Sequence, residues 1–395
     1  MIILKLLKMI RITKLSKDIQ RIILLFLCWK MILILISFMA IKFIPLSYQD
    51  RFLGGGPINY HLSPQLFSWA NFDGEHYLSI AIFGYKGLEQ AFFPVYPMLI
   101  SFFAKPLSED LLSSLINSTI IGLIISNAVF LLALIILYEL IRKDFSKKIA
   151  LLTISLLLIF PTSFYFGALY NEALFLLLSV NSFISARNGK WMQAGIWGAF
   201  ASGTRIFGIL LFPALLIEAY IQGEKLSKAL WTLLIPLGLG IYMLYQYLTV
   251  GDALAFYHLQ KLVGEQHQSG LTLLPQVYFR YVKMILTVDK GSFIYQTIWL
   301  EFLIGIMFFA LPIYGYFKKI RLSYLFYAMA GFLLPSIQGS FSSVPRYVLI
   351  LFPSFIILAL WLDRLPKILR IFFFLLIIPL LIIETSLFLR GYWVS

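Results

Sequence analysis

The chain has 395 residues, of which 61% are hydrophobic and only 13% are charged, and its net charge is +14. Soluble globular domains have about 45–50% apolar and about 25% charged residues, so the composition excludes a soluble fold. A membrane span takes about 20 residues, so roughly ten spans with their loops fill the chain and leave no room for a sizeable soluble catalytic domain.

The positive charge would suggest a nucleic acid partner in a soluble protein. In a membrane protein, Lys and Arg gather in short cytoplasmic loops and set the topology. We therefore predict no nucleic acid partner. The single cysteine, Cys28, excludes an intrachain disulfide and a cysteine-based metal site.

The N-terminal segment 1–21 is rich in Lys and Arg and has one acid, Asp18. This pattern is typical of an amphipathic segment on the cytoplasmic face of a membrane. It does not resemble a cleaved signal, because the apolar run that follows, 22–45, is long enough to span and shows no small-residue cleavage site. We expect this first span to run from the inside to the outside.

The polar segment 46–90 then lies outside. The next apolar run, 91–104, is too short to span and is typical of an interfacial or re-entrant helix. The run 112–141 ends in the basic cluster 142–148, which must face the cytoplasm. This requires that 91–104 does not cross, so the first outer loop is predicted to cover 46–110 and to contain short interfacial helices.

The remaining apolar runs alternate between the two sides and return each basic loop to the cytoplasm. The run 191–220 is too long for one span and contains Gly203-Thr204-Arg205, so two short helices are expected there. A polar outer loop is expected at 249–291. The expected spans after 112–141 are 149–166, 170–186, the two helices of 191–220, 229–248, 292–315, 323–337, 346–362 and 371–389.

These segments predict an all-α, polytopic membrane helix bundle of about eleven spans. The bundle is a single transmembrane domain over 22–389, with a cytoplasmic N-terminus and a short outer tail, 390–395. The protein is thus expected to be a multi-pass integral membrane protein, with membrane lipids among its partners.

A cluster of polar residues, Asp73-Gly74-Glu75-His76-Tyr77, closes the polar part of the first outer loop and opens a short helix. Asp73 takes the position expected for the N-cap, and Gly84, directly before Tyr85, is expected to end the helix. Two acids and a histidine in front of an interfacial helix indicate a functional site, because the whole chain has only 18 acids.

Further motifs follow along the chain: Phe92-Phe93-Pro94-Val95-Tyr96-Pro97, Phe160-Pro161-Thr162-Ser163, Tyr170-Asn171-Glu172, Ala201-Ser202-Gly203-Thr204-Arg205 and Val344-Pro345-Arg346-Tyr347. With these blocks the chain resembles the PIG-V-like mannosyltransferases, the GPI mannosyltransferase II family with its prokaryotic relatives. Many relatives carry Arg-Trp where this chain has Asn71-Phe72. The resemblance implies a GT-C membrane glycosyltransferase with an essential acid in the first outer loop and a polyprenyl- or dolichyl-phosphate sugar donor.

With such a donor, we predict that Asp73 is the general base that takes the proton of the acceptor hydroxyl. One base and a phosphate leaving group suffice for a single displacement with inversion. Glu75 and His76 complete the predicted catalytic set by orienting the acceptor or tuning Asp73. The predicted supporting residues are Tyr77, Tyr85, Tyr170 and Glu172.

Arg205 and Arg346 are the candidate clamps for the donor phosphate, because arginine binds phosphate in a bidentate fork and stays charged. Arg205 lies within an apolar run, where a charge indicates function by default. The alternative for Arg346 is snorkelling to the surface, and the alternative for Glu172 is helix capping. Glu301, in the run 292–315, also needs a partner in the membrane, and an arginine is one candidate.

No metal or other cofactor is predicted. His258, Glu265 and His267 have the residue types of a ligand set, but their spacing matches no metal motif. A solvated loop explains them better, and a divalent metal stays an unsupported alternative.

The predicted function is the transfer of a hexose to a lipid or glycan acceptor on the outer or lumenal face, and mannose is implied by the resemblance. In a prokaryote the membrane would be the plasma membrane. A transporter or flippase would have its site at the midplane between repeats, and the sequence shows no repeat. A lipid-linked glycan ligase or polymerase is a second alternative, which the outer loop 249–291 keeps open. A non-catalytic assembly subunit is a third.

Overall fold

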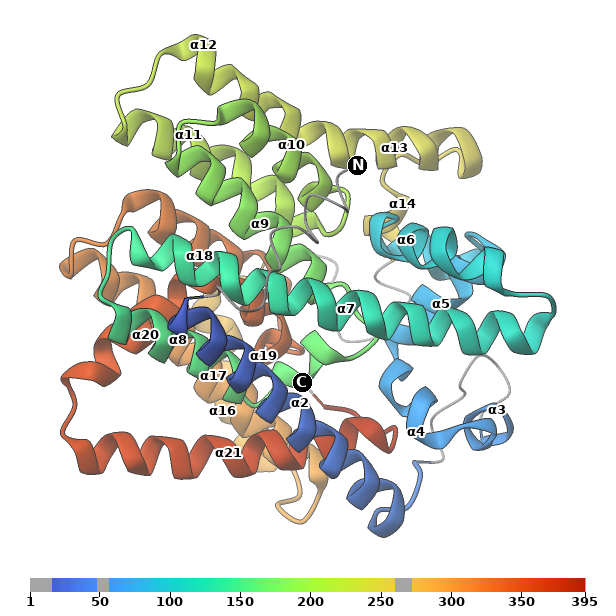
Figure 1. Cartoon of the computed structure of the whole chain (residues 1–395). Helices are drawn as coiled ribbons and strands as arrows, with labels where there is room; N and C mark the ends of the chain where they lie inside the picture. The colour runs from blue at the N-terminus through green and yellow to red at the C-terminus, as the bar shows by residue number, and fades with distance from the viewer. Residues whose placement is uncertain (1–15, 48–56, 260–271, 395) are drawn as a thin grey trace.

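A computed structural model describes residues 16–47, 57–259 and 272–394 (Figure 1). Most of the basic segment 1–21, part of the first outer loop (48–56), and Glu265 and His267 lie outside the described residues. Every regular element in the described part of the chain is helical. This confirms the all-α class that the composition predicts.

The four longest described helices are α2 (Lys17–Phe43), α7 (Leu111–Arg142), α17 (Phe293–Phe317) and α21 (Lys367–Leu389). The other α-helices are α3 (Pro57–Leu62), α4 (Pro64–Phe67), α5 (Asp73–Phe83), α6 (Val95–Ala104), α8 (Lys147–Ile159), α9 (Glu172–Arg187), α10 (Trp191–Ser202), α11 (Leu211–Ile221), α12 (Leu226–Ala229), α13 (Ile235–Val250), α14 (Ala255–His258), α16 (Leu274–Thr287), α18 (Leu322–Ser336), α19 (Val344–Tyr347) and α20 (Phe352–Arg364).

Among the described residues, five helical segments are long and apolar enough to cross a membrane. A sixth results if Val344–Ile350 and Phe352–Arg364, which meet at a bend of 92°, form one broken span. The protein is therefore an integral membrane protein, but the predicted eleven spans are not confirmed.

Fewer helices than predicted are long enough to span, because several apolar runs form broken or shortened helices. Phe160-Pro161 separates α8 from α9, which have 13 and 16 residues. At 1.5 Å per residue these helices are about 20 and 24 Å long, whereas the hydrocarbon core is about 30 Å thick. Hydrophobicity along the sequence gives the length of an apolar run, but it does not give the length of the helix that forms within that run.

The first predicted outer loop folds into the short helices α3–α6, which gather at the N-terminal end of α7 (Figure 1). α6 packs against α5 and α7 and has 10 residues. This length, about 15 Å, fits the half-helix predicted for 91–104, whose place in the membrane stays a prediction.

The polar loop predicted over 249–291 is not irregular throughout. α16 lies within it, packs against α17 and buries Val277 and Tyr281. Its apolar residues recur at helical spacing among polar ones, so the polar composition that indicated a loop belongs to an amphipathic helix.

Four of the segments predicted to face the cytoplasm lie close together. Three ion pairs connect them: Arg187–Asp144, Lys148–Asp363 and Lys147–Asp18. The connection between α7 and α8 therefore touches the start of α2 and the ends of α9 and α20. This common side agrees with the charge pattern, and the face of the membrane to which it belongs stays a prediction.

Glycines bring α13 and the turn before it close to α10. A Cβ on Gly238 would lie 1.8 Å from the Ala199 carbonyl oxygen, and one on Gly195 would lie 2.1 Å from the Trp231 carbonyl oxygen. Small residues permit such close approach of backbones. This packing fixes the end of α10, directly before Thr204 and Arg205.

Candidate active site

Asp73 is the first residue of α5 and does not cap it. The N-cap residue is Phe72, with φ 58° and ψ −119°, and its side chain makes no capping hydrogen bond. The prediction that Asp73 is the N-cap is therefore wrong. A positive φ is uncommon for a residue with a Cβ, so the backbone is strained directly before Asp73. α5 ends before Gly84, as predicted.

The carboxylate of Asp73 faces an arginine from the far end of the sequence. Arg346 Nη2 lies 2.5 Å from Asp73 Oδ2, and Arg346 Nε lies 2.6 Å from Glu172 Oε1. The same Glu172 oxygen lies 2.5 Å from Arg205 Nη1. Asp73, Arg346, Glu172 and Arg205 thus form one continuous chain of ion pairs, the charged cluster.

Asn171 connects two of the motif segments at the charged cluster. Its side-chain oxygen accepts a hydrogen bond from Arg205 Nη1 at 2.7 Å. Its amide nitrogen donates to the Thr204 carbonyl oxygen at 2.9 Å. The start of α9 is thereby fixed to the turn after α10, and both ends of the Arg205–Glu172 pair are held in place.

Two further contacts connect the first outer loop to the start of α9. The Tyr170 hydroxyl donates to the Asn71 carbonyl oxygen at 2.7 Å. A Cβ on Gly74 would lie 3.3 Å from the Leu169 carbonyl oxygen, so a glycine lets α5 approach this segment closely. Tyr170, predicted as a supporting residue, therefore helps to place Asp73 beside Glu172.

Burial separates Asp73 from the other members of the charged cluster. Its side chain is 27% exposed, whereas those of Arg346, Arg205 and Glu172 are 9%, 8% and 0% exposed. Two positive and two negative charges balance, which lets them stay buried. Arg346 is buried, so it does not snorkel. Within the cluster, Asp73 is the carboxylate that a bound molecule reaches most readily.

Aromatic rings surround both guanidinium groups. The Arg346 guanidinium carbon lies 4.8 Å from the centre of the Tyr170 ring and 5.2 Å from that of Tyr165. The Arg205 guanidinium carbon lies 5.6 Å from the Tyr347 ring centre. Such cation–π contacts stabilise a partly desolvated arginine.

A cavity of about 390 Å³ opens onto the charged cluster, and Asp73, Arg205 and Arg346 line it. Glu75 and His76 are not among the residues that line it. His76 instead stacks on Phe92, with the ring centres 4.5 Å apart. The structure thus brings Asp73 and both predicted clamps together, but it does not bring Glu75 and His76 to the cavity wall.

The two tyrosines that follow Asp73 have different places. Tyr77 lines the cavity, and burial raises its pKa well above the usual value, so its hydroxyl stays neutral. The Tyr85 hydroxyl donates to the Phe92 carbonyl oxygen at 2.8 Å. Tyr85 lines a separate apolar groove.

This second hollow, the α6–α13 groove, has a volume of about 740 Å³ and lies between α5 and α6 on one side and α10 and α13 on the other. It borders the charged cavity: the Tyr242 hydroxyl, on the groove wall, donates to the carbonyl oxygen of Phe92, on the cavity wall, at 2.8 Å. Gly203 lines the groove and Thr204 lines the cavity.

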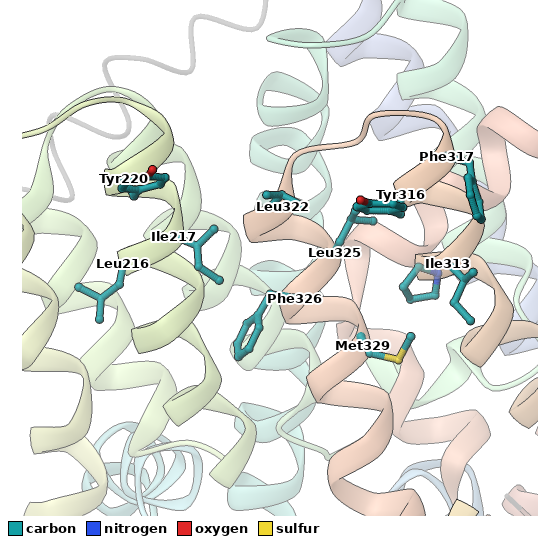
Figure 2. A pocket seen from close by; sticks show the side chains of 11 residues that line it. Leu216, Ile217, Tyr220, Ile313, Tyr316, Phe317, Leu322, Leu325, Phe326 and Met329 are labelled. Atoms are coloured by element: carbon teal, nitrogen blue, oxygen red, sulfur yellow. The ribbon is translucent and has the colours of Figure 1, made fainter. Parts of the chain in front are cut away.

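Another apolar groove, of about 890 Å³, lies between α11, α17 and α18. Figure 2 shows Ile217 on α11 pointing toward Phe326 on α18, and Met329 of α18 on the side of Ile313 in α17. It shares no lining residue with the charged cavity.

Sequence reasoning missed Asn171 and Tyr165, which contact the two arginines, and Phe207 and Tyr347, which line the cavity. Phe207 lies two residues after Arg205, and Tyr347 directly follows Arg346. An aromatic residue next to an arginine in an apolar segment was the available signal. Among the described residues, no three His, Cys, Asp or Glu side chains come together as a metal site.

Residues 18–219, just over half of the chain, match the family model described as mannosyltransferase (PIG-V). The chain belongs to the PIG-V mannosyltransferase family. The match contains Asp73, Glu172 and Arg205, while Arg346 lies beyond it. No curated protein matches the chain.

Solved structures resemble the fold distantly. The Archaeoglobus fulgidus oligosaccharyltransferase in the apo form has 15% identity and a TM-score of 0.47, with 93% of this chain and 56% of that chain covered. The archaeal oligosaccharyltransferase AglB from the same organism, in complex with an inhibitory peptide and a dolichol-phosphate, has 13% identity and a TM-score of 0.43, with 94% and 56% covered. The chain thus spans about half the length of these structures, and similarity this low says nothing about its chemistry.

Proposed function

We propose that the protein is a membrane glycosyltransferase that moves a hexose, mannose by its family, from a polyprenyl-phosphate donor to a hydroxyl of a lipid or glycan acceptor. The observation that carries this proposal is the charged cluster at the wall of one cavity, in a chain that belongs to the PIG-V family. Donor, acceptor and stereochemistry are parts of the proposal.

Asp73 is the proposed general base. Its partly exposed carboxylate lines the cavity, where it takes the proton of the acceptor hydroxyl as that oxygen bonds to the anomeric carbon of the sugar. The bond from this carbon to the phosphate oxygen breaks in the same step, and polyprenyl phosphate leaves. Attack from the face opposite the leaving group inverts the anomeric centre. A positioned base contributes about 10²–10⁴ in rate.

Arg346 and Arg205 are the proposed clamp for the donor phosphate. Both line the cavity, and their guanidinium groups offer fixed donors where negative charge develops on the departing phosphate. Glu172 contributes by holding both guanidinium groups through one oxygen. A lysine would supply the charge, but its three N–H donors share one nitrogen and lack the planar fork of a guanidinium.

The α6–α13 groove is the proposed place for the isoprenoid chain of the donor. Its wall is almost wholly apolar, which suits a hydrocarbon, and it borders the charged cavity through the Phe92 carbonyl. A donor that lies across this border has its chain in the groove and its sugar phosphate beside Arg205.

The proposed orientation places the charged cavity on the outer or lumenal face. The bundle end connected by Arg187–Asp144 and Lys148–Asp363 then faces the cytoplasm, in accord with the positive-inside rule. A donor carried by lipid suits this face, because nucleotide sugars are made in the cytoplasm.

Mass spectrometry of glycolipids and surface glycans from cells with and without the gene tests the function. We expect one acceptor to lose a single hexose without the gene and to regain it on complementation. The purified protein should form the same product from polyprenyl-phosphate mannose, with the anomeric configuration inverted. Loss of a whole glycan block instead would indicate a ligase or polymerase, and identical glycans with altered lipid distribution would indicate a transporter.

A further inference from the structure

Glu301 is a buried acid in α17, a helix that is long and apolar enough to span. Its side chain is the hydrogen-bond acceptor for two groups from other segments. The Tyr281 hydroxyl, on α16, donates to Oε2 at 2.6 Å, and the backbone N–H of Ser343 donates to Oε1 at 3.1 Å. Acids in such helices mark functional sites and need partners.

Ser343 forms a left-handed turn that starts the helix of Arg346. Its φ is 60° and its ψ is 8°, a conformation that a residue with a Cβ adopts at a steric cost. Its carbonyl oxygen accepts hydrogen bonds from the amides of Arg346 and Tyr347 at 3.0 and 2.9 Å. The conformation of Ser343 therefore determines where α19 begins and where its arginine lies.

A short relay thus connects the membrane acid to the charged cluster: the Glu301 carboxylate holds the Ser343 amide, and the Ser343 carbonyl holds the Arg346 amide. The Tyr281 hydroxyl orients the carboxylate from the other side and also lies 3.3 Å from Ser340 Oγ, in the segment between α18 and α19 that contains Ser343. Glu301 is not among the residues that line the charged cavity, so it acts through the backbone.

We propose that Glu301 is a positioning residue that fixes Arg346 for the donor phosphate by stabilising the left-handed turn at Ser343. This rests on the proposed function, in which Arg346 binds that phosphate. Without the carboxylate, the turn relaxes and Arg346 moves away from Asp73 and Glu172. Loss of the Glu301 carboxylate should therefore weaken donor binding more than it slows the chemical step, because the displaced group is Arg346.

The test compares Glu301→Leu and Glu301→Gln with the wild type in donor KM, kcat and affinity for polyprenyl phosphate. Glu301→Leu should raise the donor KM and the dissociation constant for polyprenyl phosphate about tenfold, since an acceptor for a buried amide is lost. Glu301→Gln keeps a carbonyl oxygen for Ser343 and should lose less. It also gives a folded variant if Glu301→Leu does not fold.

A second-site change distinguishes positioning from chemistry. Glycine adopts a positive φ without steric cost, so Ser343→Gly in the Glu301→Leu or Glu301→Gln background should restore part of the lost donor affinity. No restoration would overturn the proposal, because an acid acting directly on donor or acceptor could not be replaced by a relaxed turn.

Glu218→Gln is the matched control. Glu218 is equally buried, is held by Arg321 and Ser323, and lies beside the cytoplasmic-end ion pairs through Arg187. The Glu218→Gln exchange should lower thermal stability and leave the donor KM unchanged. An equal rise in KM for Glu218→Gln, or a wild-type KM and affinity for Glu301→Leu, would overturn the inference. A wild-type protein that neither transfers a hexose nor binds polyprenyl phosphate would contradict the proposed function itself.

Discussion

Exchanging each clamp arginine for lysine should have unequal effects, because the two arginines use their nitrogens differently. Arg346 binds Asp73 through Nη2 and Glu172 through Nε. Arg205 binds Glu172 and Asn171 through Nη1 alone. A lysine has a single nitrogen, so it can take the place of Arg205 Nη1, but it cannot occupy the positions of both Arg346 nitrogens.

The expected cost of Arg346→Lys is one hydrogen bond to a charged group, about 1.5–3 kcal/mol, or a roughly ten- to hundredfold fall in kcat/KM for the donor. For Arg205→Lys, kcat/KM for the donor should fall by less than about tenfold. The assay is transfer of labelled hexose from polyprenyl-phosphate donor to endogenous acceptors in membranes of cells without the gene. Equal losses, or a larger loss for Arg205→Lys, would refute the reasoning from nitrogen geometry.

Glu172→Gln should lower stability by roughly 3–5 kcal/mol, because it leaves both arginines without their shared buried anion; thermal unfolding in detergent measures this, and an unchanged midpoint would contradict it. Cysteines at positions Ser108 and Ser146, in a protein without the native cysteine, should be labelled from opposite sides of the membrane by an impermeant reagent; labelling from one side would disprove the topology. Gly238→Ala should destabilise the protein strongly, since its Cβ would lie 1.8 Å from a backbone oxygen. Gly240→Ala, on the same helix with nothing within 4 Å, is its control and should leave the unfolding temperature unchanged or higher.

The residues of the charged cluster could be singled out from the sequence because charge is rare in this chain. Arg205 lies in an apolar run, Glu172 lies near the start of another, and Asp73 begins a short helix. Each of these residues is charged or polar in a segment with few charges, so the local sequence is enough to single it out. Their pairing was not visible, because it depends on segments as far apart as Asp73 and Arg346.

The span count and the cap at α5 could not be predicted for a different reason. An apolar run indicates only that its residues lie in lipid or in the protein interior. The length of the helix that it forms depends on breaks such as Phe160-Pro161, where α8 ends. An aspartate before a helix is usually a cap, but Arg346 attracts this carboxylate instead. Glu301 was recognised as needing a partner, and the partners found include a backbone amide, Ser343, which no sequence pattern marks.

The most direct test of the proposed mechanism is the single-turnover rate of hexose transfer by Asp73→Asn at saturating donor. Asp73 is not the N-cap residue of α5, so the exchange mainly removes the proton acceptor and the charge that faces Arg346. The rate should fall by about 10²–10⁴, with a folded protein that still binds polyprenyl phosphate, while Glu75→Gln, away from the cavity wall, should cost far less. A folded Asp73→Asn protein that transfers hexose at the wild-type rate would contradict the role of Asp73 as the base.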